Sequence, residues 1–336
     1  MKPEPLLDID SLGVTYRGAG RRRQTRAVDG ASLRILPGET LGLVGESGSG
    51  KTSVGSAVVG LVPVTDGAIR FSGEDITRAT ARRRRDLSAQ IQVIFQDPYS
   101  SLNPSRTIAQ TLVEPLLIHR QLSRSESRQR VREMLEKVGL DGAAADRYPR
   151  QFSGGQRQRI AIARALIISP KLVVCDEPVS ALDLSVQAQV LNLLLSLQEQ
   201  LALSYLFISH DLAVVRHISQ RIAVMYRGRI MESGDAETVY GTPGHPYTAT
   251  LLAANPIPDP LEQQRNRLQT VTRRPARPDA ETMGGCPFAA RCPLTIDACI
   301  SEKPALIPGP TGALVACHRR DEAHSLMSSN STMKAK

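Results

Sequence analysis

The chain has 336 residues, a hydrophobic content of 41% and a net charge of +9. A chain of this length can bury a full core, so one large domain with an appendage, or two domains, is expected. No stretch reaches the roughly eighteen uninterrupted apolar residues that a membrane-spanning helix needs, so any membrane role must depend on partner proteins.

Two kinds of apolar pattern predict the first strands. Polar and apolar residues alternate around 7–16 and again over 31–35, as in antiparallel strands with one buried face. Residues 40–44, Thr-Leu-Gly-Leu-Val, are nearly all apolar, as in a parallel strand buried on both faces. These segments predict an α/β protein with an antiparallel edge.

A glycine-rich loop directly follows the buried strand. Residues 45–52 read Gly-Glu-Ser-Gly-Ser-Gly-Lys-Thr, which fits the Gly-x4-Gly-Lys-Ser/Thr pattern, and a helix is predicted over 53–61. Glycines let the backbone aim several N–H groups at phosphate oxygens, and the helix adds the positive end of its dipole. In such a loop the lysine reaches the β- and γ-phosphates and the threonine binds Mg²⁺. The residues predicted to hold nucleotide here are Gly45, Ser47, Gly48, Gly50, Lys51, Thr52 and Ser53, with Thr52 also on the metal.

Three further apolar runs end in polar side chains. Gln96 follows the run 91–95, Asp176 and Glu177 follow 172–175, and His210 follows 205–208 after one serine. In open α/β sheets ligands gather at the carboxyl ends of the strands. We expect Asp176 to hold Mg²⁺, Glu177 to polarise the attacking water, and His210 to contact the γ-phosphate. Gln96 is expected to contact Mg²⁺ or the water. Taken singly, each is also compatible with a strand end satisfied by solvent, and their order after a phosphate loop favours the functional interpretation.

Residues 98–166 change to a helical pattern rich in Arg, Gln and Glu, interrupted at Tyr148 and Pro149. This predicts a helical subdomain inserted into the α/β core. Within it, Ser153, Gly154, Gly155 and Gln156 precede a predicted helix over 157–168. A serine and two glycines before a helix form a second anion-binding N-terminus, although an ordinary capped helix has the same pattern.

The C-terminal part contains a proline-rich stretch, a group of cysteines and a tail, residues 321–336, that is expected to be disordered. The cysteines are spaced C-x5-C-x6-C-x17-C. In a cytosolic protein such a group binds metal more often than it forms disulfides. A [4Fe-4S] cluster is favoured because the spacings exceed the short Cys-x2-Cys of many zinc sites, while zinc and free thiols remain alternatives. The four residues are Cys286, Cys292, Cys299 and Cys317.

Together these residues resemble the ATP-binding subunits of ABC transporters. Residues 45–52 resemble the Walker A loop, 172–177 Walker B, and 153–156 the signature motif. The resemblance also covers Gln96 as the Q-loop glutamine, His210 as the switch histidine, Asp183 at the end of the D-loop 180–183, and Tyr16 as the aromatic residue that stacks on adenine.

The resemblance implies an α/β P-loop NTPase (ABC ATPase) core with an antiparallel β edge, an inserted helical subdomain and a small Cys-containing C-terminal extension. Its expected boundaries are 1–250 for the ATPase domain, with the helical subdomain at about 98–166, and 251–320 for the extension. In this family two ATPase subunits pack head to tail, so that each ATP and Mg²⁺ lies between the Walker A loop of one and the signature of the other. Two membrane permease subunits and, indirectly, an extracytoplasmic solute-binding protein are the further partners.

Finer matches indicate the oligopeptide and dipeptide importer branch. They are residues 95–104, 148–156 and the His-Pro-Tyr-Thr sequence at 245–248. Phe152 stands where leucine is more usual, a change that this branch tolerates. The branch resemblance implies a peptide importer; nickel, glutathione and other small solutes are the cargo of similar proteins. Some members of the branch hold a [4Fe-4S] cluster in their C-terminal extension.

Two rival functions are weighed against transport. A nucleic-acid ATPase of the same superfamily, acting in repair or translation, is suggested by the basic charge and the cysteines, but the coiled-coil arms, inserted zinc module or tandem ATPase domains of such proteins are not visible in the sequence. An iron sensor with an idle ATPase fold conflicts with the intact Glu177 and His210. We therefore expect no nucleic-acid partner. The N-terminus lacks the apolar core of a signal peptide, and we expect a peripheral protein on the cytoplasmic face of the inner membrane.

Overall fold

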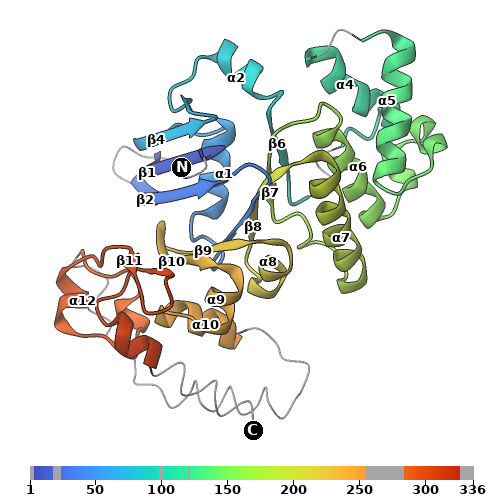
Figure 1. Ribbon diagram of the computed structural model, residues 1–336. Helices are drawn as coiled ribbons and strands as arrows, with labels where there is room; N and C mark the ends of the chain where they lie inside the picture. The colour runs from blue at the N-terminus through green and yellow to red at the C-terminus, as the bar shows by residue number, and fades with distance from the viewer. Residues whose placement is uncertain (1–3, 18–23, 98–101, 120–121, 255–283, 326–336) are drawn as a thin grey trace.

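The computed structural model describes residues 4–17, 24–97, 102–119, 122–254 and 284–325 (Figure 1). Within these residues the strands form two sheets. The smaller sheet has the strand order β2-β1-β4-β5, and the larger has the order β11-β12-β10-β9-β3-β8-β7-β6. The predicted α/β class with an antiparallel β edge is confirmed.

The antiparallel sheet begins with β1 (Leu7–Arg17), which pairs with β2 (Gln24–Ile35) on one side and β4 (Asp66–Phe71) on the other. The two-residue strand β5 (Glu74–Asp75) closes its edge. Leu7 and Ile9 of β1 are buried and alternate with more exposed residues. This alternation is the reason that the strand could be recognised in the sequence.

Five strands of the larger sheet are parallel: β9 (Arg221–Tyr226), β3 (Thr40–Val44), β8 (Ser204–Ser209), β7 (Leu172–Asp176) and β6 (Ile91–Ile94). All residues of β3 and β8 are buried, which explains their largely apolar sequences. On the other side of β9, β10 (Arg229–Asp235) runs antiparallel to it.

Helices cover this sheet and extend beyond it. The helix α1 (Lys51–Val59) follows β3, and α8 (Leu212–Ile218) follows β8. The predicted helical subdomain contains α4 (Ile108–His119), α5 (Arg124–Lys137) and α6 (Gly154–Leu166), which lie together with α7 (Leu184–Leu201) on one side of Figure 1. The remaining elements are α2 (Ala81–Leu87), α9 (Ala236–Gly241), α10 (Pro246–Ala254), η1 (Gly142–Asp146) and η2 (Pro149–Gln151). No helix in the described part of the chain has the length and apolar character required to cross a membrane.

The C-terminal segment, residues 284–325, packs directly onto the larger sheet. Its strand β12 (Leu314–Val315) pairs with β10, and β11 (Ile307–Pro308) pairs with β12. It also contains η4 (Ala289–Arg291) and α12 (Asp297–Ser301). Residues 320–325 are helical, which differs from the disorder expected from 321 onward; residues 326–336 of that predicted tail, and most of the proline-rich stretch, lie outside the described residues.

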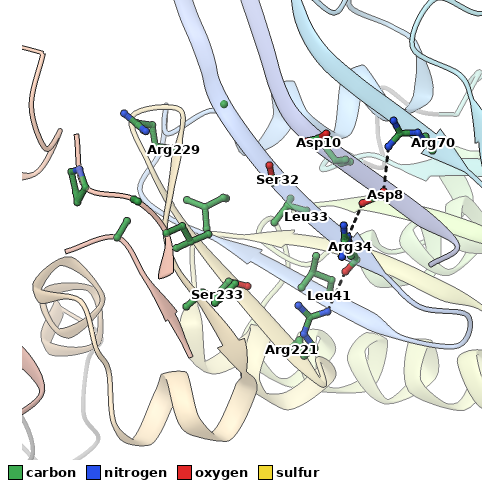
Figure 2. Close-up of a pocket in the computed structure, with 18 residues that line it drawn as sticks. Asp8, Asp10, Ser32, Leu33, Arg34, Leu41, Arg70, Arg221, Arg229 and Ser233 are labelled. Atoms are coloured by element: carbon green, nitrogen blue, oxygen red, sulfur yellow. Dashed lines mark hydrogen bonds and ion pairs between the residues drawn. The ribbon is translucent and has the colours of Figure 1, made fainter. Parts of the chain in front are cut away.

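A cavity of about 580 Å³ lies where the C-terminal segment meets both sheets (Figure 2). Arg34 and Arg70 line it and both pair with Asp8, at 2.9 and 3.5 Å. Arg221, also in the lining, pairs with Glu39 at 3.1 Å. Because none of the predicted nucleotide-binding residues lines this cavity, the candidate site lies elsewhere, at the strand ends.

Candidate nucleotide-binding site

The predicted catalytic and phosphate-binding residues meet at one edge of the larger sheet. The neighbouring strands β3, β8, β7 and β6 are parallel, so their carboxyl ends lie on the same side. The phosphate loop follows β3, His210 follows β8, Asp176 and Glu177 lie at the end of β7, and Gln96 comes two residues after β6. In this register Asp176 is opposite Ile208, and Val44 is opposite Ser209.

The backbone of the phosphate loop makes direct hydrogen bonds to the side chain of its lysine. Lys51 is buried, and its Nζ donates to the carbonyl oxygens of Gly45 at 2.7 Å and Glu46 at 2.9 Å. Burial lowers the pKa of Lys51, whereas the nearby carboxylates oppose this change. Gly50 has φ of 104°, and a Cβ there would lie 2.2 Å from the carbonyl oxygen of Ala27. Only glycine fits this turn at the start of α1.

Thr52, the last residue of the phosphate loop, contacts Asp176 at the end of β7. The hydroxyl of Thr52 donates to Asp176 Oδ1 at 3.0 Å. Burial raises the pKa of Asp176, and Glu177 adds to the increase, while Thr52 and Lys51 oppose it. A threonine hydroxyl and a carboxylate are oxygen ligands of the type that Mg²⁺ binds, so the residues present fit the predicted metal.

Glu177 and His210 form a second pair at this edge. His210 Nδ1 lies 3.3 Å from Glu177 Oε2, and the side chain of Glu177 is 18% exposed. Glu177 has a φ of 49°, and its backbone N–H donates to the carbonyl of Ile208 at 3.0 Å. A left-handed conformation is costly for a residue other than glycine and is frequent in functional sites. It places a carboxylate beside an imidazole, an arrangement suited to proton transfer.

Tyr16 and Gln96 occupy less enclosed positions. The hydroxyl of Tyr16, near the end of β1, donates to Ser53 Oγ at 3.1 Å, and the residue is 41% exposed. The structure therefore brings Tyr16 to the first turn of α1, next to the phosphate loop. Gln96 is exposed beyond the end of β6.

Residues 153–156 do not lie at the carboxyl ends of the strands, where the other predicted site residues meet. Ser153 caps α6 in a capping box with Gln156, whose N–H donates to Ser153 Oγ at 3.3 Å. A Cβ on Gly155 would lie 2.3 Å from Val186 Cγ1, so this glycine permits close packing of α6 on α7. Asp183 caps α7 by accepting from the N–H of Val186 at 3.0 Å, which lowers its pKa. Ser153 and Gln156 are both exposed on the surface of this chain.

The four cysteines belong to one small unit. Cys286 and Cys299 are buried, and the N–H of Cys286 donates to the carbonyl of Cys299 at 2.8 Å. Burial raises the pKa of Cys286 to about 12 and that of Cys317 to about 11, and the neighbouring cysteines add to both increases. Nevertheless, among the described residues no group of three or more His, Cys, Asp or Glu side chains is arranged to hold a metal ion. The predicted iron–sulfur site is thus not preformed.

Three residues at the site, Glu46, Tyr247 and Arg291, make contacts that the sequence did not predict. Glu46 of the phosphate loop donates its backbone N–H to the hydroxyl of Tyr247 at 2.9 Å, and its carboxylate receives two hydrogen bonds from Arg291. Tyr247 belongs to the His-Pro-Tyr-Thr sequence, which marks a branch but indicates no contact. No local pattern points to Arg291.

The fold and the site define an ATPase of the ABC class. A family model described as ABC transporter matches residues 28–180, and one described as the C-terminal region of the oligopeptide/dipeptide transporter matches residues 231–299. The chain is 49% identical over 297 residues to the oligopeptide transport ATP-binding protein OppF of Salmonella typhimurium, covering 88% of each chain. It is 49% identical over 282 residues to OppF of Escherichia coli, covering 84% of each.

Solved structures agree with this assignment. The dimeric ATP-binding cassette MJ0796 in a post-hydrolysis state with ADP and Pi matches with a TM-score of 0.62 at 26% identity, over 68% of this chain and 98% of its own. The cbiO1 protein of Clostridium perfringens, part of an ABC transporter complex, matches with a TM-score of 0.62 at 26% identity, over 70% of this chain and 90% of its own. The chain belongs to the ABC transporter ATP-binding proteins of the oligopeptide and dipeptide import branch, and it is an ATPase.

Proposed function

We propose that this chain binds Mg-ATP on residues 45–52 and hydrolyses it with Glu177 and His210 while paired with a second ATPase subunit. The proposal is supported by five side chains that lie together at the carboxyl ends of the parallel strands. They are Lys51, Thr52, Asp176, Glu177 and His210. Such a site places a lysine and backbone N–H groups, which can bind phosphates, beside a carboxylate that can polarise a water molecule.

The residues divide the work of hydrolysis. Lys51 and the loop N–H groups bind the β- and γ-phosphates, and Tyr16 stacks on adenine. Thr52, Asp176 and Gln96 would hold Mg²⁺, which when bound neutralises phosphate charge. Glu177 polarises the water and takes up its proton as the water oxygen attacks the γ-phosphorus. The bond from that phosphorus to the bridging oxygen breaks, ADP leaves with the electron pair of that bond, and His210 stabilises the released phosphate through a hydrogen bond.

The second subunit completes the site. Ser153 and Gln156 are exposed at the N-terminus of α6, where a helix end favours anions. We infer that residues 153–156, with Asp183, contact the ATP held by the other subunit. That MJ0796 is a dimer in its ADP-bound and Pi-bound structure supports this arrangement.

The permease subunits are proposed to dock beside the Gln96 loop. A hollow of about 160 Å³ lies there, lined mainly by apolar residues, and Phe95 (41%) and Leu61 (63%) are exposed within it. Two permeases bound to an ATPase pair would place the chain peripherally on the cytoplasmic face of the membrane, with the solute-binding protein on the other side. The domain division at about 250 and the helical subdomain at about 98–166 are part of this proposal.

The proposed cargo is an oligopeptide or dipeptide. The names of the two OppF relatives and the match to the oligopeptide/dipeptide transporter C-terminal region support it. Transport of nickel or glutathione by the assembled complex, without transport of peptides, would contradict it.

We also propose that Cys286, Cys292, Cys299 and Cys317 hold a [4Fe-4S] cluster after their side chains rearrange. Four thiols in one segment form the donor set that such clusters use, and iron binding would require their deprotonation. Anaerobically purified protein should be brown, with broad absorbance at about 400 nm. Colourless protein with stoichiometric zinc, or with no metal, would overturn the cluster.

Titration of the full chain with Mg-ATP tests the nucleotide site. Lys51→Ala should abolish measurable binding because the triphosphate loses its charge-assisted contact. Undiminished binding by this variant would refute the site.

A further inference from the structure

One side chain of the C-terminal segment, Arg291, forms hydrogen bonds with the phosphate loop. Arg291 lies between Cys286 and Cys292, and its guanidinium donates from Nη1 to Glu46 Oε2 at 2.9 Å and from Nη2 to Glu46 Oε1 at 3.0 Å. The same Nη1 lies 3.4 Å from the hydroxyl of Tyr226, its second acceptor. A bidentate pair of this kind fixes the orientation of both side chains.

A second contact holds the backbone of Glu46. Its N–H donates to the hydroxyl of the fully buried Tyr247 at 2.9 Å. The Tyr247 ring packs against Phe288 of the C-terminal segment, with ring centroids 5.3 Å apart. The backbone N–H of Tyr247 donates to His245 Nδ1 at 2.9 Å. Glu46 is therefore fixed at its backbone and at its carboxylate by groups outside the loop.

The negative charge of Glu46 acts on the electrostatics of the nucleotide site. Its carboxylate lies close enough to Lys51 to favour the charged form of that lysine. An unpaired carboxylate at this position would also repel a triphosphate, because like charges near a partly buried site are weakly screened. Arg291 neutralises it.

We propose that Arg291 and Tyr247 are positioning residues of the phosphate loop, through which the C-terminal segment sets the affinity of the loop for nucleotide. The inference rests on the proposed ATP site and deepens it by assigning its regulation to the segment that contains the cysteines. Any change that displaces residues 286–292 releases Glu46 and weakens nucleotide binding.

The test is Mg-ATP titration of the full chain together with steady-state ATPase kinetics of the assembled complex. Arg291→Ala should raise Kd and KM about two- to fivefold, the range for exposed ion pairs, with kcat unchanged within about twofold. Arg291→Lys should recover part of the loss, because it restores charge but not the bidentate geometry. Glu46→Gln combined with Arg291→Ala should return Kd toward the unmodified value, because the uncompensated carboxylate is gone.

Arg216→Ala is the matched control. Arg216 makes an equally bidentate pair with Glu237, at 3.0 and 2.7 Å, between α8 and α9. Its removal should leave Kd unchanged. Tyr247→Phe gives an independent variant that retains the packed ring and loses only the acceptor for Glu46, and it should also weaken binding.

Unchanged Kd in both Arg291→Ala and Tyr247→Phe, with binding still abolished by Lys51→Ala, would overturn this inference alone. A double variant as weak as Arg291→Ala would overturn the electrostatic explanation. Retained binding in Lys51→Ala would instead count against the proposed ATP site.

Discussion

His210 Nδ1 lies 3.3 Å from Glu177 Oε2, although the two residues directly follow different strands, β8 and β7. The pairing joins an imidazole to a carboxylate that is mostly shielded from solvent. This proximity supports the proposed role of Glu177 in activating water, with His210 as its direct neighbour.

Replacing Glu177 by glutamine should lower the ATPase rate of the purified complex by about 10²- to 10⁴-fold, the usual contribution of a positioned base. Binding of ATP should persist, because the amide keeps the size of the side chain. Phosphate release and nucleotide titration measure the two effects. The exposed Glu199 of α7 offers a control, since Glu199→Gln should change neither. Unchanged turnover in Glu177→Gln would refute the assignment.

His210→Ala should also reduce turnover, and the losses should not add in the double variant with Glu177→Gln, because paired residues act as a unit. Rates of the two single variants and the double variant, measured side by side, give the coupling. Strictly additive losses would show that the observed proximity has no catalytic consequence.

Asp176→Asn should raise the Mg²⁺ concentration required for half-maximal ATPase activity. The change removes a carboxylate charge beside Thr52 Oγ1, 3.0 Å away, while the size of the side chain is kept. A Mg²⁺ titration at saturating ATP measures the effect. An identical Mg²⁺ requirement in variant and unmodified protein would remove Asp176 from the metal site.

His245 should make the protein sensitive to acid. Burial lowers the pKa of this histidine to about 3 from an ordinary value of 6.5, so the folded protein keeps it neutral. Its stabilising contribution is present above about pH 6.5 and is lost as the pH falls toward 3, because the unfolded chain takes up the proton first. The Tm of the unmodified protein should therefore fall more steeply between pH 6.5 and 4 than that of His245→Gln.

The exposed His217 provides the comparison for that experiment, since His217→Gln should keep the slope of the unmodified protein. Burial raises the pKa of the neighbouring Glu232 to about 7, which gives a contribution of the opposite sign between about pH 4.5 and 7. Glu232 is present in every variant, so its effect cancels in the difference. Parallel Tm curves for unmodified protein and His245→Gln would contradict the prediction.

Local pattern was sufficient for the buried parallel strands β3, β7 and β8 and for their convergence. The apolar runs that became β3, β7 and β8 match the structure to within a residue or two, because strands buried on both faces leave few alternatives. Since parallel strands share an edge, the pattern also anticipates that Lys51, Asp176 and His210 meet.

Contacts between distant side chains could not be anticipated in this way. The left-handed φ of Glu177 and the pairing of Arg291 with Glu46 depend on tertiary packing, which has no signature in residue spacing. The same applies to β12, whose two residues become a strand only because β10 presents an edge to them. Strand propensity over so short a segment carries little information.

Nucleotide-dependent pairing tests the central claim most directly. The measurement is sedimentation of the Glu177→Gln chain, with any ATPase subunit that co-purifies with it, in the presence and absence of Mg-ATP. We predict that ATP converts single subunits to pairs, that ADP does not, and that Ser153→Arg prevents the conversion without loss of ATP binding. Bound ATP with no change in mass would contradict a site shared between two subunits.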